Sequence, residues 1–280
     1  MSYDKFKANV MAAKIIEERD RVAVFPSLTN REYEGIVKNV GDTVTIKGAG
    51  KIAMTSSSDG KPILLSDPGV IEGTNAILSI KEQRAFNFMV PDIDSAQGAK
   101  GALSVYERQA GVQLANEHDK FIADLAADPL AVNLFNSVTL VDNTTVLAAI
   151  DSAVQKLYEN DVPATEKMTM VVSPRFWTLV RQNLDAIDTD NSDMLKRGAL
   201  GMYNGVDIKM SNNVHTSGTG GANDHIILMT KQAIAFVDAI TKIEGKRANN
   251  YMADEIRGLS LFGAKIIRPK EMVVLNVKYA

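Results

Sequence analysis

The chain has 280 residues, of which 45% are hydrophobic and 23% charged, and its formal net charge is -3. This is ordinary globular composition, and the length is enough for two domains or for one elongated one. The slight acidity argues against a general nucleic-acid-binding protein, and the absence of cysteine excludes disulfides, zinc–thiolate sites, iron–sulfur clusters and cysteine nucleophiles.

Residues 1–35 are predicted to form an N-terminal arm that contains one short amphipathic helix. Its apolar residues recur at helical spacing, at Phe6, Val10, Ala13 and Ile16. The first twenty-odd residues, up to Arg21, are charged and lack the apolar run of a secretory signal. The arm is too small to bury a core of its own, so we expect it to lie against the rest of the chain or against a neighbour.

Residues 36–72 are predicted to form an extended loop built around a β-hairpin. Val44 and Ile46 alternate with polar residues, which is the period of a half-exposed strand, and a second short strand is expected over 51–55. Asp59-Gly60 is a common hairpin-turn signal. Such a hairpin is marginal in water by itself. It therefore either docks on its own subunit or projects and becomes ordered against a partner, and the glycines that flank it favour the projecting arm.

A pair of strands is predicted over 73–90, followed by one long helix from Asp94 to Asp128. Asp94 and Gln97 have the spacing of a capping box. Asp128 precedes a proline, which disfavours helical backbone there and ends the helix. The expected apolar stripe consists of Ala99, Leu103, Tyr106, Ala110, Leu114, Phe121 and Leu125. A helix of this length is about 50 Å long, which suits a strut between parts of the molecule.

Three glycines within this helix, at positions 98, 101 and 111, each weaken it by about 1 kcal/mol relative to alanine. Two interpretations are open: the glycines are there by chance, or strands cross the helix closely where side chains are missing.

Residues 130–240 alternate helix and strand, which predicts an α/β unit. A strand over 137–141 is followed by a helix whose apolar face consists of Val146, Leu147, Ile150, Val154 and Leu157. The continuous apolar run over 168–172 predicts a buried strand. Ser173-Pro174 has the order of an N-cap and an N1 proline, and Trp177 in the helix that follows is expected to anchor the core. Further strands are expected over 206–210, 225–229 and 233–237.

The last part of the chain, residues 241–280, begins with a charge-rich stretch over 242–257 and then has two apolar segments that read as closing strands. Closing strands need a sheet to join, and the strands over 73–90 are the natural partners. We therefore expect 73–129 and 241–280 to form one domain around the long helix.

No motif in the sequence carries recognisable chemistry. The three histidines, His118, His215 and His225, are far apart and have no metal-ligand spacing around them, and His118 is expected to be packed. Ser217 to Gly221 lacks the lysine and the strand–loop–helix order of a phosphate-binding loop. The acidic cluster over 188–193 lacks the glycine and the glutamate of a calcium loop. We therefore predict no catalytic, cofactor-binding or metal-binding residue, no cofactor and no enzymatic activity.

The order of these elements resembles the major capsid proteins of tailed bacteriophages, whose fold is shared with encapsulins. Three stretches carry the likeness, namely Val40 to Ile46 with its hairpin, Leu78 through the strand to Gln97, and Arg257 to Pro269. Each stretch is weak by itself and specific in combination, and the likeness covers nearly the whole chain.

The resemblance implies an α+β fold with four parts. These are an N-terminal arm (1–35), an extended loop (36–72), a peripheral domain with a long spine helix and β-sheet (73–129 and 241–280) and an axial α/β domain (130–240). It implies pentamers and hexamers that form an icosahedral shell around the double-stranded DNA of a tailed phage. The subunit would be part of the virion and would assemble in the bacterial host cytoplasm.

The resemblance also implies partners: copies of the chain itself, a scaffolding protein, a portal, and packaged DNA touched without sequence specificity. No membrane partner is expected, because no window approaches the roughly 18 apolar residues of a membrane span. Some relatives carry a long N-terminal scaffolding segment, whereas this chain enters its arm almost directly after Met1, so we expect a separate scaffolding protein or none. Nothing identifies an acceptor for a lysine–asparagine crosslink.

Two alternatives stay open at this stage. The first is an encapsulin-like nanocompartment shell, which would hold an enzyme cargo in place of DNA. The second is a small-molecule α/β enzyme with its site near 173–224, which would not need the extended loop for its activity.

Overall fold

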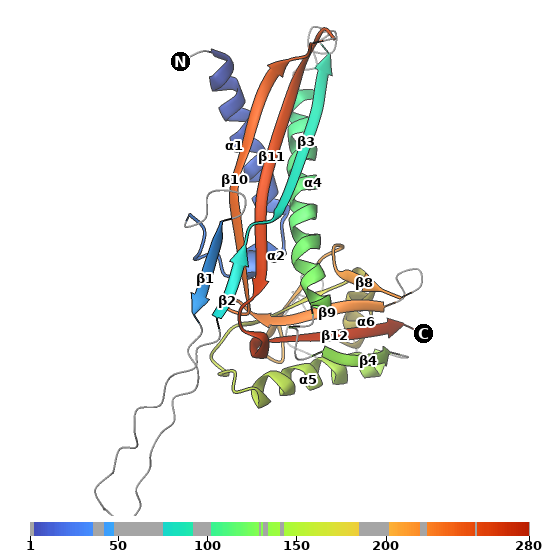
Figure 1. The fold of residues 1–280 in the computed structure, drawn as a ribbon. Coiled ribbons are helices and arrows are strands. Elements are labelled where there is room, and N and C mark those ends of the chain that lie inside the picture. The colour runs from blue at the N-terminus through green and yellow to red at the C-terminus, as the bar shows by residue number, and fades with distance from the viewer. Residues whose placement is uncertain are drawn as a thin grey trace, which may run out of the picture.

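The structure is a computed structural model, and it shows an elongated molecule with a compact α/β end and a long arm of sheet and helix (Figure 1). It describes residues 3–35, 42–47, 75–91, 102–128, 130, 134–140, 143–184, 202–218, 223–249 and 251–279. The predicted capping box at 94–97, the strand over 51–55, its turns and the acidic cluster over 188–193 lie outside these residues.

Within the described residues the helices are α1 (Tyr3–Val22), α2 (Phe25–Leu28), α4 (Ala102–Asp124), α5 (Asn143–Glu159) and α6 (Pro174–Leu184). There are also two short 3-10 helices. η1 (Leu125–Ala127) follows α4, and η2 (Pro269–Glu271) follows the strand β11. The strands are β1 (Thr43–Lys47), β2 (Asn75–Ser79), β3 (Glu82–Pro91), β4 (Leu134–Leu140), β5 (Met168–Val172), β6 (Met202–Tyr203), β7 (Val206–Met210), β8 (His215–Ser217), β9 (Asn223–Thr230), β10 (Ile234–Arg247), β11 (Ala253–Ile266) and β12 (Met272–Tyr279).

The described strands form three sheets. A two-stranded sheet pairs β1 with β2, and a three-stranded antiparallel sheet has the order β10-β11-β3. A mixed seven-stranded sheet has the order β4-β12-β9-β5-β7-β6, with β8 paired to β9. The three-stranded sheet forms the long arm and the seven-stranded sheet forms the compact end (Figure 1).

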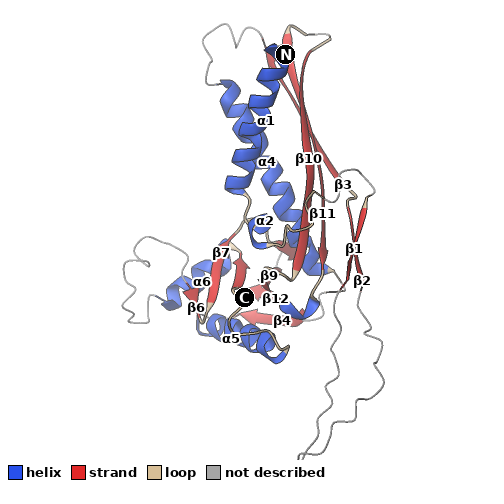
Figure 2. Ribbon diagram, turned by 90° about the vertical axis from the view of Figure 1, so that its left-hand side faces the viewer, coloured by secondary structure: helices blue, strands red, loops and turns tan. Residues whose placement is uncertain are grey.

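Helices α1 and α4 lie side by side on one face of the three-stranded sheet, and the pair β1–β2 lies beyond its other face (Figure 2). The alternation of side chains fits this arrangement. Phe86 and Phe88 of β3 point to the helices, where Phe88 stacks on Tyr106 of α4 with ring centroids 6.0 Å apart. Their neighbours along β3 are exposed on the open face. One face of this sheet is therefore packed, and much of the other is available to a partner.

The seven-stranded sheet is covered on both faces. Apolar residues of α5 and α6 pack on one face around Met170, Leu228 and Leu275, and Ile122 and Ala126 lie against the other face. The predicted face of α5 is confirmed, since Val146, Ile150, Val154 and Leu157 are buried there. The buried strand over 168–172 is also confirmed.

The start of α6 is capped as predicted, because the backbone N–H of Phe176 donates to Ser173 Oγ at 3.3 Å. The expectation for Trp177 is only partly right. Trp177 packs at the edge of this core and stays partly exposed, whereas its neighbour Phe176 is fully buried. On a short helix a shift of one residue turns the side chain by about 100°.

The prediction for the long helix is right about its end but only partly right about its buried face, where Leu114 is buried as predicted. Asp128 has extended backbone directly after η1, as the following proline requires. The buried positions of α4 are, however, Glu107, Gly111, Leu114, Ala115, His118, Asp119, Ile122 and Ala123. Tyr106 is exposed, and Phe121 is only half-buried. Polar residues occupy this face because each of them finds a partner on another element.

Of the two interpretations of the glycines, close crossing is right for Gly111, but the element that crosses α4 there is a helix and not a strand. A Cβ atom at Gly111 would lie 2.8 Å from the carbonyl oxygen of Ile15 in α1. Gly98 and Gly101 lie outside the described residues.

The two closing strands go to different sheets. β11 pairs with β3 along its length, from Ala253 opposite Pro91 to Phe262 opposite Glu82, as predicted. β12 instead lies between β4 and β9 in the seven-stranded sheet, so its predicted pairing with the strands over 73–90 is wrong. The strand expected over 233–237 is only the beginning of β10, which continues through the charge-rich stretch to Arg247.

Candidate assembly surfaces

The base of the predicted extended loop is fixed to the body of the subunit. β1 pairs with β2, so Lys47 lies directly opposite Asn75 at the point where the two strands leave the described part of the chain. The buried residues under this pair are Ile46, Leu78, Ile80, Ala235 and Val237. The alternation predicted for β1 is confirmed, because Ile46 is buried while Thr43 and Thr45 are exposed. Both ends of the segment 48–74 are thereby held at one place.

The N-terminal segment packs against its own chain. Arg19 of α1 is buried and forms an ion pair with Asp238 of β10, and its Nη2 also donates to Asp20 Oδ1 at 2.8 Å. Lys14 lies 3.7 Å from the buried carboxylate of Glu107 in α4. Ile15 is buried, whereas the predicted apolar residues Ala13 and Ile16 are exposed and half-buried. The packed face of α1 is therefore rotated from the predicted one.

Asp119 of α4 caps the short helix α2 from outside that helix. Its Oδ1 accepts hydrogen bonds from the backbone N–H groups of Val24 at 3.1 Å and Phe25 at 3.0 Å. Burial raises the pKa of Asp119 to about 6, against the opposing effect of these hydrogen bonds. Burial also raises the pKa of Asp238, which Arg19 opposes. Two buried carboxylates thus hold the N-terminal segment in place.

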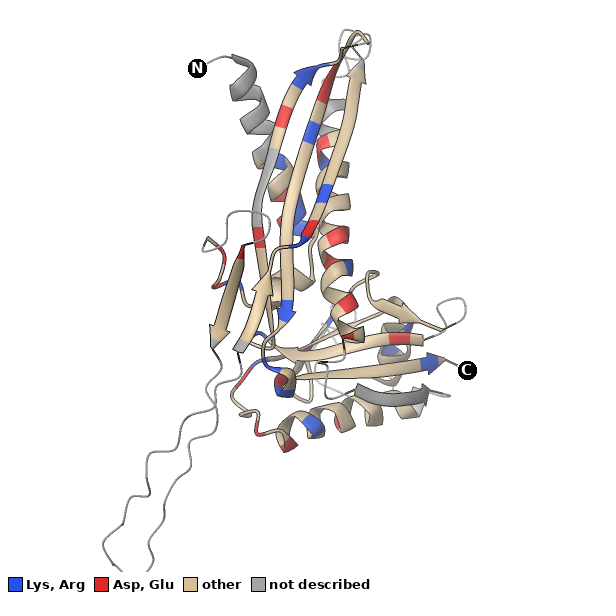
Figure 3. Ribbon diagram, in the orientation of Figure 1, with Lys and Arg blue, Asp and Glu red and all other residues tan. Residues whose placement is uncertain are grey.

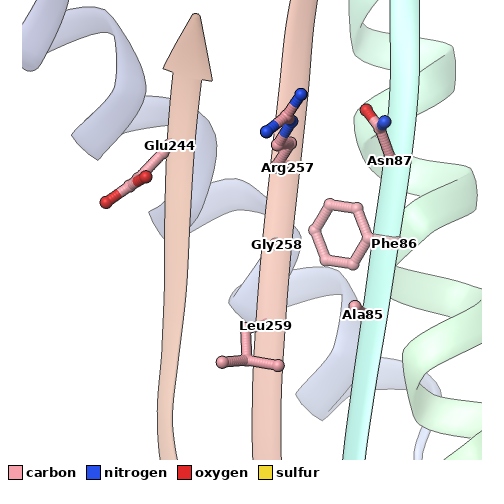
Figure 4. Close-up of a pocket in the computed structure, with 7 residues that line it drawn as sticks. All are labelled: Ala85, Phe86, Asn87, Glu244, Arg257, Gly258 and Leu259. Carbon is pink, nitrogen blue, oxygen red and sulfur yellow. The ribbon is translucent and has the colours of Figure 1, made fainter.

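The open face of the three-stranded sheet carries a hollow of about 400 Å³ above Gly258 (Figure 4). The register places Arg257 opposite Asn87, and both contact Glu255, whose carboxylate accepts from Asn87 at 2.6 Å and Arg257 at 2.7 Å. These hydrogen bonds lower the pKa of Glu255. Leu259 adds an apolar wall. The surface therefore offers a shallow groove with both apolar and polar contacts.

Large apolar side chains are exposed toward the far end of the arm. Tyr251 and Met252 lie in the turn between β10 and β11 and are 68% and 82% exposed. Met89 of β3 and Val105 of α4 are also exposed. Apolar side chains gathered at one end of a molecule are typical of a protein–protein contact.

The structure brings together two of the histidines that the sequence separated. His215 and His225 lie opposite each other on β8 and β9, with ring centroids 4.9 Å apart and an edge-to-face arrangement. His215 Nδ1 lies 2.7 Å from Asp124 Oδ1 at the end of α4, and Ser217 Oγ lies 2.7 Å from His225 Nε2. Ser217 therefore belongs to this contact, while 219–222 lie outside the described residues.

His118 is packed, as expected. Its ring is 1% exposed and meets the ring of Phe262 edge-on at 4.5 Å, and its Nε2 lies 3.3 Å from Ser260 Oγ. Burial, with the charges of Arg19 and Arg31, lowers the pKa of His118 to about 3. In the part of the chain that the structure describes, no three His, Asp or Glu side chains are arranged to hold a metal ion.

Sequence reasoning missed a network that fixes the last strand. The hydroxyl of Tyr279 donates to Asp224 Oδ2 at 2.7 Å and lies 3.0 Å from Ser173 Oγ. The guanidinium of Arg175 lies 4.2 Å from the centre of the Tyr279 ring. The capping role of Ser173 was the only part of this network that the sequence indicated, because Ser173, Asp224 and Tyr279 are far apart in the chain.

No protein-family model matches this chain, and no curated protein matches it by sequence. Solved structures do match. A chain from Mycobacterium phage Che8 is 27% identical, with a TM-score of 0.71 over 90% of both chains. A chain from the capsid structure of the cyanophage P-SCSP1u is 19% identical, with a TM-score of 0.69 over 92% of this chain and 89% of that one.

A chain from a virus-like particle of Pyrococcus furiosus is 10% identical, with a TM-score of 0.59 over 96% of this chain and 99% of that one. These matches define the class: the chain has the α+β fold of capsid shell proteins. The two phage chains match it with higher TM-scores than the virus-like particle does, so the fold of this chain is that of the tailed-phage capsid structures.

Proposed function

We propose that this chain assembles into pentamers and hexamers that close an icosahedral shell around the double-stranded DNA of a tailed phage. One observation carries the proposal, the anchored base of the extended loop. The β1–β2 pair packs on the subunit through Ile46, Leu78 and Ile80, so a segment as long as 48–74 begins and ends at one fixed point. A segment held in this way can reach a neighbouring subunit, where its contacts bury additional surface.

In this proposal the chain has the four parts implied by the resemblance, with 1–35 as the arm and 36–72 as the loop. The peripheral domain comprises 73–129 and 241–280, and the axial domain 130–240. The axial domain additionally holds the strand β12, which lies between β4 and β9. Two surfaces are proposed as contacts with neighbouring copies. One is the exposed apolar end of the three-stranded sheet, around Tyr251 and Met252, and the other is the groove above Gly258.

We propose that the shell contacts its DNA without sequence specificity and receives the DNA through a portal. Basic and acidic residues are interspersed along the described sheet and helices (Figure 3). A chain of net charge -3 gains little affinity from phosphate contacts, which suits a container that must not immobilise its contents. A scaffolding protein is proposed to guide assembly, which takes place in the host cytoplasm before the shell becomes part of the virion.

The proposed role is structural and not enzymatic. No helix among the described residues has the length and apolar character to cross a bilayer. The contacts found on the subunit are suited to holding other subunits, and closed symmetry multiplies many modest contacts into a stable shell.

The proposal is tested by shortening the loop at its base. Because Lys47 lies opposite Asn75, a two-residue Asn-Gly turn can replace residues 48–74 and leave the β1–β2 pair intact. We expect the shortened chain to fold with a Tm within a few degrees of the full chain. We expect it to form no shells by negative-stain microscopy under conditions in which the full chain does.

The full chain provides the decisive control. If it yields only monomers of 30.4 kDa under all assembly conditions, the shell proposal fails. If the shortened chain still assembles normally, the loop has no role in subunit contacts. Particles that the full chain forms in the bacterial host are then treated with nuclease. DNA that stays protected inside the particles identifies a DNA-filled capsid, and enclosed protein without protected DNA identifies a shell with protein cargo.

A further inference from the structure

All three histidines of the chain lie around the last turns of α4. The chain contains only three, and they are His118 within α4, His215 bonded to Asp124 at its end, and His225 next to His215. This is the place where α4 meets both the three-stranded and the seven-stranded sheet (Figure 1). Histidine is the side chain that changes charge in mildly acidic solution.

His118 connects α4 to the three-stranded sheet. It lies between Phe262 of β11 and Phe236 of β10, with ring centroids 4.5 Å and 5.5 Å away, and contacts Ser260. The charged groups around it are Arg19 of α1, Arg31 after α2, Asp119 of α4 and Asp238 of β10, and Arg84 of β3 lies over the Phe262 ring. A proton on His118 would add positive charge to a buried site where Arg19 and Arg31 already disfavour it.

His215 and His225 connect α4 to the seven-stranded sheet. Asp124 of α4 and the neighbouring Asp224 are the acidic groups near them. His225 is 7% exposed, and its Nδ1 has no hydrogen-bond partner. The edge-to-face rings do not direct two lone pairs to one point, so the pair is not arranged as a metal site. A positive charge on His225 would be buried beside the His215 ring, with no hydrogen-bond partner at Nδ1.

We propose that this junction is an acid-sensitive joint, in which protonation of His118 and His225 loosens α4 from both sheets. Its use in a shell, to let subunits change shape as the pH falls, rests on the proposed function. The joint itself is a property of the single chain.

The direction of the effect follows from the titration of the buried rings. Burial lowers the pKa of His225, and it lowers the pKa of His118 to about 3. A histidine whose pKa is depressed in the folded chain stabilises the fold above its ordinary pKa of about 6.5. That contribution is lost progressively as the pH falls from about 6.5 toward 3. Asp119 acts in the opposite direction, because its raised pKa favours its protonated form in the fold.

The test compares the full chain with a variant that cannot be protonated at the joint. His118→Gln and His225→Gln keep a hydrogen-bonding group near the Nε2 positions, and His215→Asn keeps a donor to Asp124. The difference between Tm at pH 7.5 and Tm at pH 5.0 is measured on the unassembled chain. Because Asp119 is present in both proteins, its contribution cancels in the comparison. We expect this Tm difference to be about 3 to 6 °C larger in the natural chain.

Amide hydrogen exchange locates the effect. After correction for the pH dependence of chemical exchange, we expect residues 117–124 and 215–217 to exchange faster at pH 5.0 in the natural chain, and α5 to be unchanged. Asp151→Asn, a carboxylate change on α5 away from the joint, serves as the control and should leave the pH response intact. Equal pH responses in the natural chain and the triple variant, or equal loosening of α5, would overturn the proposal.

If the triple variant does not fold, NMR titration of the histidine ring protons in the natural chain gives the answer. The proposal is supported if two of the three rings have pKa values clearly below 6.5. It is overturned if all three rings have pKa values near 6.5. Particle formation at pH 7.5 is scored separately. A chain that forms no shells but keeps the acid response contradicts the proposed function and leaves the joint in place.

Discussion

Single buried polar residues decide where the elements of this subunit meet. Glu107, His118 and Asp119 lie on the packed face of α4, a face that a sequence pattern assigns to apolar residues. Each has a partner from another element: Lys14 for Glu107, Ser260 for His118, and backbone N–H groups for Asp119. Buried polar groups are tolerated when they are hydrogen-bonded, and they then fix one arrangement of the elements.

Asp119 provides a prediction at the residue scale. Its folded-state pKa of about 6 lies above its ordinary value of 3.8, so the ionised form is disfavoured in the fold at neutral pH. Asp119→Asn keeps one oxygen for Val24 and Phe25 and removes the ionisation. We expect the variant to be more stable by about 1 to 3 kcal/mol at pH 8, measured by urea unfolding.

The size of this effect depends on pH in a defined way. The difference between the two proteins should shrink as the pH falls through 6 and vanish below about 4, where Asp119 is protonated in both the folded and unfolded chain. Glu17→Gln, an exposed carboxylate change on α1, should leave stability nearly unchanged at pH 8 and at pH 4. A variant less stable than the natural chain at pH 8 would mean that the charge on Asp119 strengthens the cap of α2 more than burial weakens it.

At the scale of elements, α4 is organised by what crosses it. Gly111 lets α1 approach so closely that a Cβ atom there would lie 2.8 Å from the carbonyl oxygen of Ile15 and 3.3 Å from the backbone nitrogen of Arg19. Close approach of two helices in this way brings Arg19 to Asp238. The glycine therefore has a packing role that offsets its low helix propensity.

Gly111→Ala separates these two effects. Helix propensity by itself would stabilise the variant by about 1 kcal/mol, whereas the contact with backbone atoms of α1 should destabilise it by about 1 to 3 kcal/mol. We expect net destabilisation in denaturant unfolding. The matched control is Gln113→Ala, an exposed change on the same helix, which should be neutral or slightly stabilising. Net stabilisation by Gly111→Ala would show that α1 does not pack on α4 as described.

The strands show which parts of an element are visible in sequence. The alternation in β1, the apolar run of β5 and the cap of α6 were predicted and are present. The length of β10 was not, because its second half runs through charged residues that face solvent on the arm. A strand with polar residues on its open face carries a weak hydrophobic signal.

At the scale of the whole molecule, one core joins the arm to the compact end. It contains Ile122 of α4, Phe236 and Phe262 of the three-stranded sheet, and Ile227 and Val274 of the seven-stranded sheet. The chain crosses between the sheets twice here, since β9 leads into β10 and β11 leads to β12. The two ends of the molecule therefore share the buried residues on which both depend.

We expect the unassembled chain to unfold in a single cooperative transition. Calorimetric and van't Hoff enthalpies should agree, and probes of the arm and of the compact end should report the same midpoint. Two separate transitions, with Trp177 in the compact end reporting one and an added probe at Tyr251 reporting the other, would contradict this. The shared core would then contribute too little to couple the two parts.

The sequence by itself determined the features that depend on residues a few positions apart. Helical and strand periods, the cap at Ser173 and the break before Pro129 are set by local backbone geometry, and their order along the chain was enough to indicate the class of shell protein. Only the tertiary structure decided that β12 joins the seven-stranded sheet, that α1 crosses α4 at Gly111, and that His215, next to His225, meets Asp124 at the end of α4. Those outcomes depend on contacts between residues far apart in the chain, such as Asp124 with His215 at a separation of 91 positions, and no local pattern encodes which distant surface offers a buried polar group its partner.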